Sequence, residues 1–378
     1  MRSLKVLVVS LCLTSAIHAQ DSVKSDESVA LGKALFFDKN LSKNRTQSCA
    51  TCHNPEAGFT DNRENGIKSQ ASLGDDGKSL GDRQAPTAAY AMFSPEFHYN
   101  EKTKKYVGGQ FWDGREATLA GQAGGPPLNP IEMGMKDKQE VVSRLQENAY
   151  YVQTMKKIYG EDIFNDTNKA YMAMTKALEN FEKTDFFAPF DSKYDRFLKG
   201  EYDLTVLEDL GRSLFFSNNN NSCATCHVLK GEDKPGETFT NYEYHNIGVP
   251  VNEELRVKNG VTALDDGLLA NPAVNDTAQR GKYKVPTLRN VAITGPYMHN
   301  GVFKDLRTVV EFYDKYNNPD RKINPETGEP WAAPEVEETI SLDDLKANKQ
   351  NDRKVDALVA FMKLLTDKRY EHLLNENK

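Results

Sequence analysis

One five-residue motif occurs twice in the chain, letter for letter. Cys-Ala-Thr-Cys-His stands at residues 49–53 and again at residues 223–227. In such a C-x-x-C-H pentapeptide the two thiols can add to the vinyl groups of a haem, and the adjacent imidazole then binds the iron. The alternatives are a zinc site built from two C-x-x-C pairs, a thioredoxin-like redox pair, or two short disulfides. None of them requires a His after both motifs, so the repeat predicts two covalently attached haems.

The cysteine count favours the same interpretation. The chain has five cysteines, and Cys12 lies in the N-terminal segment that precedes the first motif by more than thirty residues. The other four are consumed by the two motifs: Cys49, Cys52, Cys223 and Cys226. Once both haems are attached, no cysteine remains for a structural disulfide.

The N-terminus predicts a secretory signal peptide over residues 1–19. Arg2 and Lys5 precede an apolar run at residues 6–13, and small residues lead to a cleavage site after Ala19. A membrane-anchoring helix is the alternative, but the apolar run is shorter than the roughly 20 residues of a membrane span. Because haem attachment to such motifs follows export, we expect the mature protein in the periplasm of a Gram-negative bacterium.

Length and charge narrow the class of protein further. A chain of 378 residues is long enough for two domains with separate cores, and a mean hydropathy of −0.65 is typical of a soluble protein. The formal charge of −7 becomes −9 when the signal peptide removes its two positive charges. An acidic surface argues against nucleic-acid binding and suits a basic redox partner, although it is also a common solubility device.

The repeat extends beyond the haem motifs. Residues 32–37 read Gly-Lys-Ala-Leu-Phe-Phe and residues 211–216 read Gly-Arg-Ser-Leu-Phe-Phe, each ahead of its motif. A Phe-Thr pair follows each motif, at Phe59 and at Phe239. This repeated order predicts a duplicated cytochrome c fold. The fold class is therefore expected to be all-α, with long loops and little sheet.

The same pattern suggests where the two domains begin and end. We expect an N-terminal peroxidatic haem domain over residues 20–195 and a C-terminal electron-transfer haem domain over residues 196–378, joined near residues 189–200. The last helix, within residues 352–375, could pack back on the first domain. Apolar residues at helical spacing predict helices at residues 28–37, 141–159, 170–181, 306–316 and 355–365. Residues 317–348 are rich in Pro, Glu and Asp and are expected to form an inserted loop.

Three further stretches carry a resemblance to a known family. Residues 110–115 read Gln-Phe-Trp-Asp-Gly-Arg, residues 285–291 read Val-Pro-Thr-Leu-Arg-Asn-Val, and residues 296–301 read Pro-Tyr-Met-His-Asn-Gly. With the duplicated haem motif, they resemble the bacterial dihaem cytochrome c peroxidase and MauG superfamily, in the family's order. The resemblance implies two haem c groups and reaction with hydrogen peroxide.

The resemblance also implies an active site. The haem on His53 would have the open face, with Gln122, Pro126 and Glu132 above it. A carboxyl over an apolar haem face can have a raised pKa and move a proton, so Glu132 is the expected acid and base, while Gln122 can hydrogen-bond the peroxide. Without the family match, Glu132 would be a solvated charge and Gln122 a surface amide. Trp112 resembles the indole that carries electrons between the haems, and is otherwise a core aromatic residue.

Gln84, Thr294 and Pro296 match the positions of a calcium site between the two domains of the family. Hard oxygen ligands suit that ion. The family has Asn at the first of these positions, whereas this chain has Gln84. One calcium ion is therefore expected, with an altered side-chain ligand.

At two places the sequence departs from the pattern of the cytochrome c peroxidases, and both bear on which branch of the family the chain resembles. Cytochrome c peroxidases close the resting first haem with a His in the loop after the first motif, but residues 54–97 contain none, so this haem is expected to be open. His98 could replace it, and a surface His is the simpler interpretation. The second haem should be bound by His227 and by Tyr313, which stands where peroxidases have Met and MauG has Tyr. Met298 is the rival ligand, and Tyr313 is otherwise a core aromatic.

The leading function is reduction of hydrogen peroxide with electrons from a small redox protein, such as cytochrome c or a cupredoxin. Electrons would enter at the C-terminal haem and pass Trp112. The main alternative is a MauG-type oxidase acting on a protein or small-molecule substrate by long-range electron transfer. The third candidate function is that of a pure electron-transfer cytochrome. The presence of Glu132 and Gln122 argues against it. Because Trp112 and Trp331 are the only tryptophans, a surface relay beside the second haem is not expected. The resemblance is compatible with a homodimer.

Overall fold

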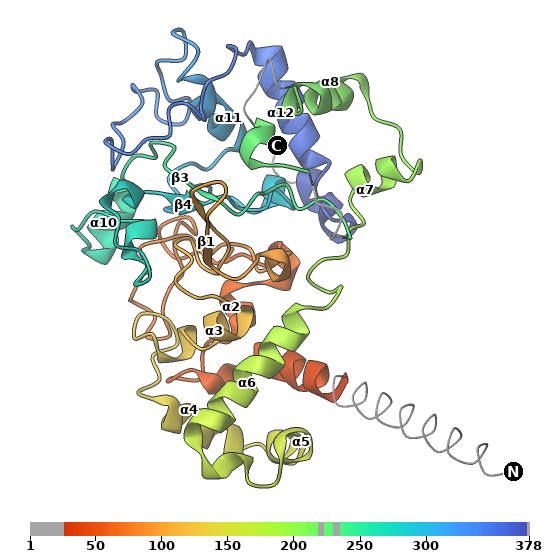
Figure 1. Cartoon of the computed structure of the whole chain (residues 1–378), viewed down its shortest axis with the longest axis vertical. Coiled ribbons are helices and arrows are strands. Elements are labelled where there is room, and N and C mark those ends of the chain that lie inside the picture. The colour runs from red at the N-terminus through yellow and green to blue at the C-terminus, as the bar shows by residue number, and fades with distance from the viewer. Residues whose placement is uncertain (1–25, 218–222, 230–234, 376–378) are drawn as a thin grey trace, which may run out of the picture.

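The computed structural model describes residues 26–217, 223–229 and 235–375, so the predicted signal peptide lies outside it. Two large hydrophobic cores follow each other along the chain, one built from residues 31–188 and the other from residues 194–365. In Figure 1 they occupy the lower and the upper part of the molecule. Within the described ranges, no helix has the length and apolar character of a membrane span.

The described part of the chain is mostly helical, with long connecting loops. The first half contains a helix at residues 26–36, α2 (Cys49–Cys52), α3 (Leu119–Ala123), α4 (Lys138–Gln146), α5 (Ala149–Tyr159) and α6 (Thr167–Glu182). The second half contains α7 (Lys193–Leu198), α8 (Val206–Phe215), α9 (Cys223–Cys226), α10 (Glu253–Asn259), α11 (Leu306–Asp314) and α12 (Asp352–Lys363). The predicted helical fold is confirmed at this level.

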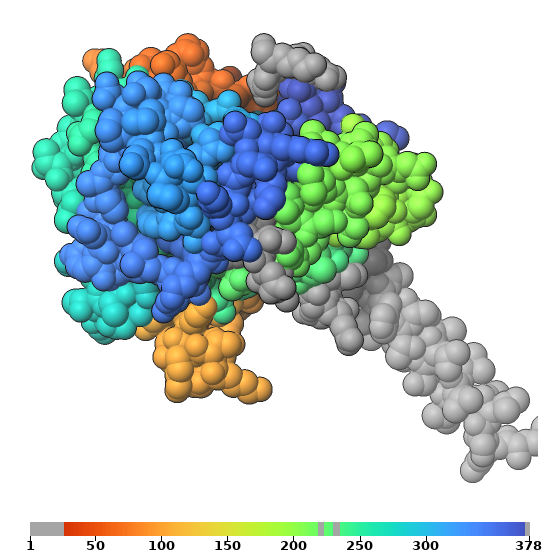
Figure 2. Space-filling model, turned by 90° about the horizontal axis from the view of Figure 1, so that it is seen from above, coloured from red at the N-terminus to blue at the C-terminus, as the bar shows by residue number. Residues whose placement is uncertain are grey.

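Sheet is limited to two short antiparallel pairs in the described residues. They are β1 (His98–Asn100) with β2 (Lys105–Val107), and β3 (Tyr244–His245) with β4 (Tyr283–Lys284). The β1–β2 hairpin projects from the body of the molecule, where it is orange in Figure 2. At its base, Val107 forms a bridge with Glu243 of the second half.

Two helix boundaries differ from the predicted ones for local reasons. The predicted helix at residues 141–159 is divided into α4 and α5, because Asn148 leaves the helical conformation and its side chain accepts a hydrogen bond from the first turn of α5. The predicted joint at residues 189–200 contains α7. There Ser192 and Asp195 form a capping box, which stabilises a helix start in a segment without strong periodicity.

Each half contains the same close contact between two helices. Gly32 packs against Ala177 of α6, and Gly211 of α8 packs against Ala357 of α12. A Cβ atom at either glycine would lie 1.9 Å from the carbonyl oxygen of the facing alanine. Only glycine allows this approach, so the repeated Gly-x-x-Leu-Phe-Phe segment of the sequence corresponds to a repeated packing contact.

We expect Gly211→Ala to destabilise the haem-loaded protein, because the added methyl group would force α8 away from α12. Overpacking of this kind typically costs about 1–3 kcal/mol. Chemical denaturation should show a lower midpoint. Ser213→Ala, at an exposed position of the same helix, is the matched control and should change stability by less than about 0.5 kcal/mol. Equal midpoints for the two variants would contradict the close contact.

The end of the chain returns to the first half through its tail and not through α12. Helix α12 packs against α8 and α11 of the second half. The 3₁₀ helix that follows, η9 (Lys368–Asn375), reaches the segment just after the first haem motif. The Tyr370 hydroxyl donates to the Pro55 carbonyl at 2.6 Å, and the Arg369 guanidinium lies 5.5 Å from the centre of the Phe59 ring. The tail therefore connects the two halves.

A buried ion pair holds α7 onto the second core. Arg289, from the Val-Pro-Thr-Leu-Arg-Asn-Val stretch, is fully buried and donates to both carboxylate oxygens of Asp195, at 2.5 and 2.8 Å. Its Nε donates to the carbonyl of Glu237 at 2.6 Å. Paired in this way, the guanidinium and the carboxylate stay charged inside the protein. The arginine of this family motif thus has a structural role.

Candidate functional site

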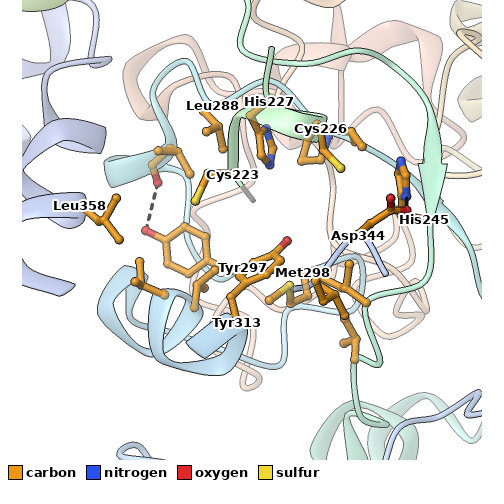
Figure 3. A pocket seen from close by; sticks show the side chains of 18 of the residues that line it. Cys223, Cys226, His227, His245, Leu288, Tyr297, Met298, Tyr313, Asp344 and Leu358 are labelled. Carbon is orange, nitrogen blue, oxygen red and sulfur yellow. Dashed lines mark hydrogen bonds and ion pairs between the residues drawn. The ribbon is translucent and has the colours of Figure 1, made fainter. Parts of the chain in front are cut away.

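The second haem motif lines a deep cavity in the upper half of the molecule (Figure 3). Cys223 and Cys226 begin and end α9, and His227 follows directly. Nδ1 of His227 donates to the carbonyl of Phe239 at 2.8 Å, which leaves Nε2 with a free lone pair. Burial lowers the pKa of His227 to about 4. The imidazole is therefore neutral, as a metal ligand must be.

Tyr313 of α11 lines the same cavity from the opposite side. In Figure 3 its phenol group points into the space below His227. Burial raises the pKa of Tyr313 well above its ordinary value, so the phenol ionises only if a bound cation displaces its proton. Met298 also lines the cavity. Both candidates for the second axial position thus lie in one pocket, 86 and 71 residues from His227 in the sequence.

The first haem motif repeats the local geometry of the second. His53 follows Cys49 and Cys52 of α2, and its Nδ1 donates to the carbonyl of Phe59 at 3.2 Å. Phe59 and its counterpart Phe239 both adopt the left-handed conformation, with φ of 59° and 52°. Burial lowers the pKa of His53 as well. All four motif cysteines are free thiols, and the donor set of each motif fits a c-type haem.

Gln122, Pro126 and Glu132 are held in one compact segment that begins in α3. Backbone N–H groups of this segment donate to the carbonyls of Gln122 and Pro126, which folds the chain back on itself before Glu132. The Asn129 side chain donates to Oε1 of Glu132 at 2.8 Å. The three residues expected above the first haem are therefore neighbours on a short stretch of chain.

The segment that carries Glu132 packs in the same hydrophobic core as the first haem motif, because Met133 belongs to that core and Cys49 packs against it. Burial raises the pKa of Glu132, and the Asn129 hydrogen bond and the charge of Arg115 partly offset this effect. Burial also raises the pKa of the Cys52 thiol to about 11, with smaller contributions from the negative charge of Asp61 and, last, from that of Glu132.

Trp112 lines two cavities at once. One is the second haem pocket, and the other lies between the halves and is lined by Gln84, Thr294 and Pro296. The indole Nε1–H donates to the carbonyl of Gln84 at 2.8 Å. The backbone carbonyl of Trp112 accepts from Lys284 of β4 at 2.9 Å. These bonds hold the indole at the junction of the two halves.

The cavity between the halves offers oxygen donors but little negative charge. The Gln84 amide, the Thr294 hydroxyl and the backbone carbonyls are hard donors of the kind that calcium prefers. Its described lining residues include no carboxylate, and Lys284 is among them. Burial lowers the pKa of Lys284 to about 8, and its ammonium group donates to Gly109. The described residues contain no cluster of three His, Cys, Asp or Glu side chains that could hold a metal.

His98 is not brought to either described cavity. It lies in the projecting hairpin, its side chain is exposed, and its Nδ1 donates to the carbonyl of Glu96 at 2.8 Å. This position agrees with the surface interpretation.

His245 of β3 is a site residue that the sequence did not indicate. It lines the second haem pocket. Its Nδ1 lies 2.9 Å from an oxygen of Asp344, and Nε2 lies 3.5 Å from Glu243. A histidine far from any motif carries no sequence signal of its own, so only the strand pairing of β3 with β4 reveals its position.

Two haem motifs on a mainly helical scaffold define a two-haem oxidoreductase of the c type. The model of the di-haem cytochrome c peroxidase family matches residues 26–203. The chain is 48% identical over 377 residues to the methylamine utilization protein MauG of Paracoccus denitrificans, covering 98% of this chain and 96% of that protein. The chain therefore belongs to the di-haem cytochrome c peroxidase family, and the resemblance seen in the sequence is confirmed.

Two other similar proteins widen the comparison. The cytochrome c peroxidase Ccp of Escherichia coli is 35% identical over 77% of this chain and 53% of its own length. The solved structure of the diheme peroxidase BthA from Burkholderia thailandensis has a TM-score of 0.82 at 28% identity, and the match covers 91% of this chain and 86% of that one. Peroxidases and MauG proteins are thus both among its relatives.

Proposed function

We propose that this protein reduces hydrogen peroxide to water in the periplasm, using electrons from a small redox protein. The observation that carries the proposal is the difference between the surroundings of the two haem motifs. Gln122, Pro126 and Glu132 stand on one short segment, whose Ala123 and Met133 belong to the hydrophobic core against which Cys49 of the first motif packs, and this arrangement suits peroxide chemistry. His227 and Tyr313 face each other across the second pocket, which suits a haem with both axial positions filled. Membership of a peroxidase family supports the same assignment.

Two cytochrome c-like domains carry the two haems in this proposal. The first, residues 20–195, uses Cys49, Cys52 and His53. The second, residues 196–378, uses Cys223, Cys226, His227 and Tyr313. When bound, the haems supply one-electron redox chemistry and an iron that can cleave the peroxide bond.

At the first haem, Glu132 moves the proton. When the bond between the two oxygens of hydrogen peroxide is cleaved to give water, a proton has to move from one peroxide oxygen to the other. Because the pKa of Glu132 is raised by burial, the carboxyl holds a proton more readily than an exposed carboxyl does, which suits it to take up and return one. Asn129 orients the carboxyl through its hydrogen bond. The Gln122 amide hydrogen-bonds the peroxide, and Pro126 contributes an apolar wall that limits water.

Trp112 passes electrons from the second haem to the first. Its position in the second haem pocket and in the cavity between the two halves supports this role. Gln84, Thr294 and Pro296 hold a calcium ion that keeps several waters. Since calcium affinity rises with the number of charged ligands, and the described lining residues include no carboxylate, the site is a weak one.

A MauG-type oxidase is the second candidate function. Tyr313 in place of Met and the 48% identity to a MauG protein favour it. In that case electrons come from a protein or small-molecule substrate, which is oxidised while peroxide is reduced. The two functions share the peroxide site and differ in the electron source.

The test starts from protein exported together with a haem-attachment system. We expect intact-mass spectra to show two covalent haems per mature chain, because the two motifs use every mature cysteine. Peroxide consumption should then depend on a reduced cytochrome c, which would favour the peroxidase over the oxidase. A mature chain that carries zinc, or a disulfide and no haem, would overturn the proposal.

A further inference from the structure

The segment after α11, residues 317–350, brings the second tryptophan close to the second haem pocket. The Trp331 ring packs edge-on against Phe312 of α11, with centroids 5.6 Å apart. Phe312 in turn contacts Tyr313, with centroids 6.2 Å apart. Since Tyr313 lines the pocket, only two ring contacts separate Trp331 from the proposed iron ligand. The sequence had suggested that no surface tryptophan served this haem.

Trp331 stands at the end of a small hairpin on the protein surface, which we call the 321–331 hairpin. Ile323 forms a bridge with Pro330, and the Trp331 indole N–H donates to the carbonyl of Arg321 at 2.8 Å. Ile323 is 48% exposed, Pro330 is exposed, and Trp331 is partly exposed. In Figure 2 the blue residues that follow α11 form much of the visible face.

This surface is acidic. Residues 317–350 contain eight Asp and Glu residues against four Lys and Arg residues. Arg321 already pairs with Asp314 and Asp352, so it offers little free positive charge. Four exposed carboxylates in the segment have no ion-pair partner within the described ranges: Asp320, Glu329, Glu337 and Glu338. The 321–331 hairpin itself has two carboxylates and two cationic residues, and Lys315 Nζ lies 5.7 Å from the centre of the Trp331 ring, so the excess of negative charge comes from the rest of the segment. An apolar patch in such an acidic segment complements a protein whose redox centre lies beneath a lysine-rich surface.

We propose that the 321–331 hairpin is the docking site of a basic, soluble one-electron redox protein, and that Trp331 and Phe312 carry its electrons to Tyr313 and the second haem. The proposal rests on the proposed function, because it needs both haems. In each encounter the partner loses one electron and the enzyme gains one. Two encounters supply the two electrons that, with two protons taken up from the buffered solvent, convert one hydrogen peroxide into two waters.

The experiment compares two donors on the same holoenzyme, a lysine-rich mitochondrial-type cytochrome c and guaiacol, a small uncharged phenol. Trp331→Leu should lower kcat/KM for the cytochrome about tenfold and leave guaiacol oxidation unchanged, because guaiacol needs no docking surface. Trp331→Phe should restore part of the loss, since it keeps an aromatic ring against Phe312. Haem spectra and melting temperatures check that both variants are folded.

The charge of the surface is tested separately. Asp320→Lys combined with Glu329→Lys should lower kcat/KM for the cytochrome about tenfold at low salt, and the difference should vanish at high salt. Glu161→Lys changes an exposed carboxylate of the first half and is the control, with kinetics close to those of the wild type.

The outcomes separate this inference from the function on which it rests. Failure of the wild type with both donors would overturn the proposed function. Turnover with guaiacol but not with the cytochrome would refute a basic partner. Turnover with both donors, unchanged in the Trp331 and charge variants, would show that electrons enter elsewhere.

Discussion

Glu132→Gln should lower peroxide turnover by about two to four orders of magnitude while both haems stay attached, because a neutral amide cannot accept and return a proton. The side chain keeps its size and can still receive the hydrogen bond from Asn129, so the fold should not change. Stopped-flow mixing with peroxide and steady-state turnover measure the effect, and haem absorption spectra confirm that the pockets are intact.

The pH profile gives an independent check on Glu132. Proton transfer begins with the carboxylate form, and burial raises the pKa of this carboxyl. Wild-type kcat/KM should therefore fall as the pH drops through that raised pKa, and this acidic limb should disappear in Glu132→Gln. Glu161→Gln, at an exposed position, is the matched control. It should keep both the wild-type turnover rate and the acidic limb of the pH profile. Unchanged turnover in Glu132→Gln would remove Glu132 from the mechanism.

Tyr313→Met should raise the reduction potential of the second haem by on the order of 0.1 V, within the range of about 0.8 V that axial ligands span. A phenolate stabilises the oxidised iron more than a thioether does.

Before mutation, the oxidised resting enzyme should show one high-spin and one low-spin haem in electron paramagnetic resonance spectra. It should also react with peroxide without prior reduction, because no ligand has to leave the first haem.

Met298→Leu is the control for the Tyr313 experiment, since Met298 lines the same pocket and is the rival ligand. Its spectra and potential should match those of the wild type. Two low-spin haems in the resting enzyme, with peroxide reactivity only after one-electron reduction, would mean that a sixth ligand closes the first haem and would refute the open site. The protein would then behave as a reductively activated cytochrome c peroxidase.

The sequence by itself determined the local chemistry of this protein. Haem attachment needs two thiols and an imidazole within five consecutive residues, so the motifs at residues 49–53 and 223–227 are visible without a structure. The amphipathic helices are readable for a similar reason, because their apolar spacing is local. Gly32 and Gly211 could also be recognised as a repeat, although the sequence did not indicate that each faces the backbone of an alanine.

Only the tertiary structure decided which distant residues share a pocket. Tyr313 and Met298 both line the cavity of His227, and Trp112 lines two cavities, because helices and loops far apart in the sequence are packed together there. Trp331 lies on an irregular, acidic loop whose sequence has no periodicity, so its contact with Phe312 could not be predicted from the sequence. Such contacts depend on long-range packing of side chains, which local propensity does not encode.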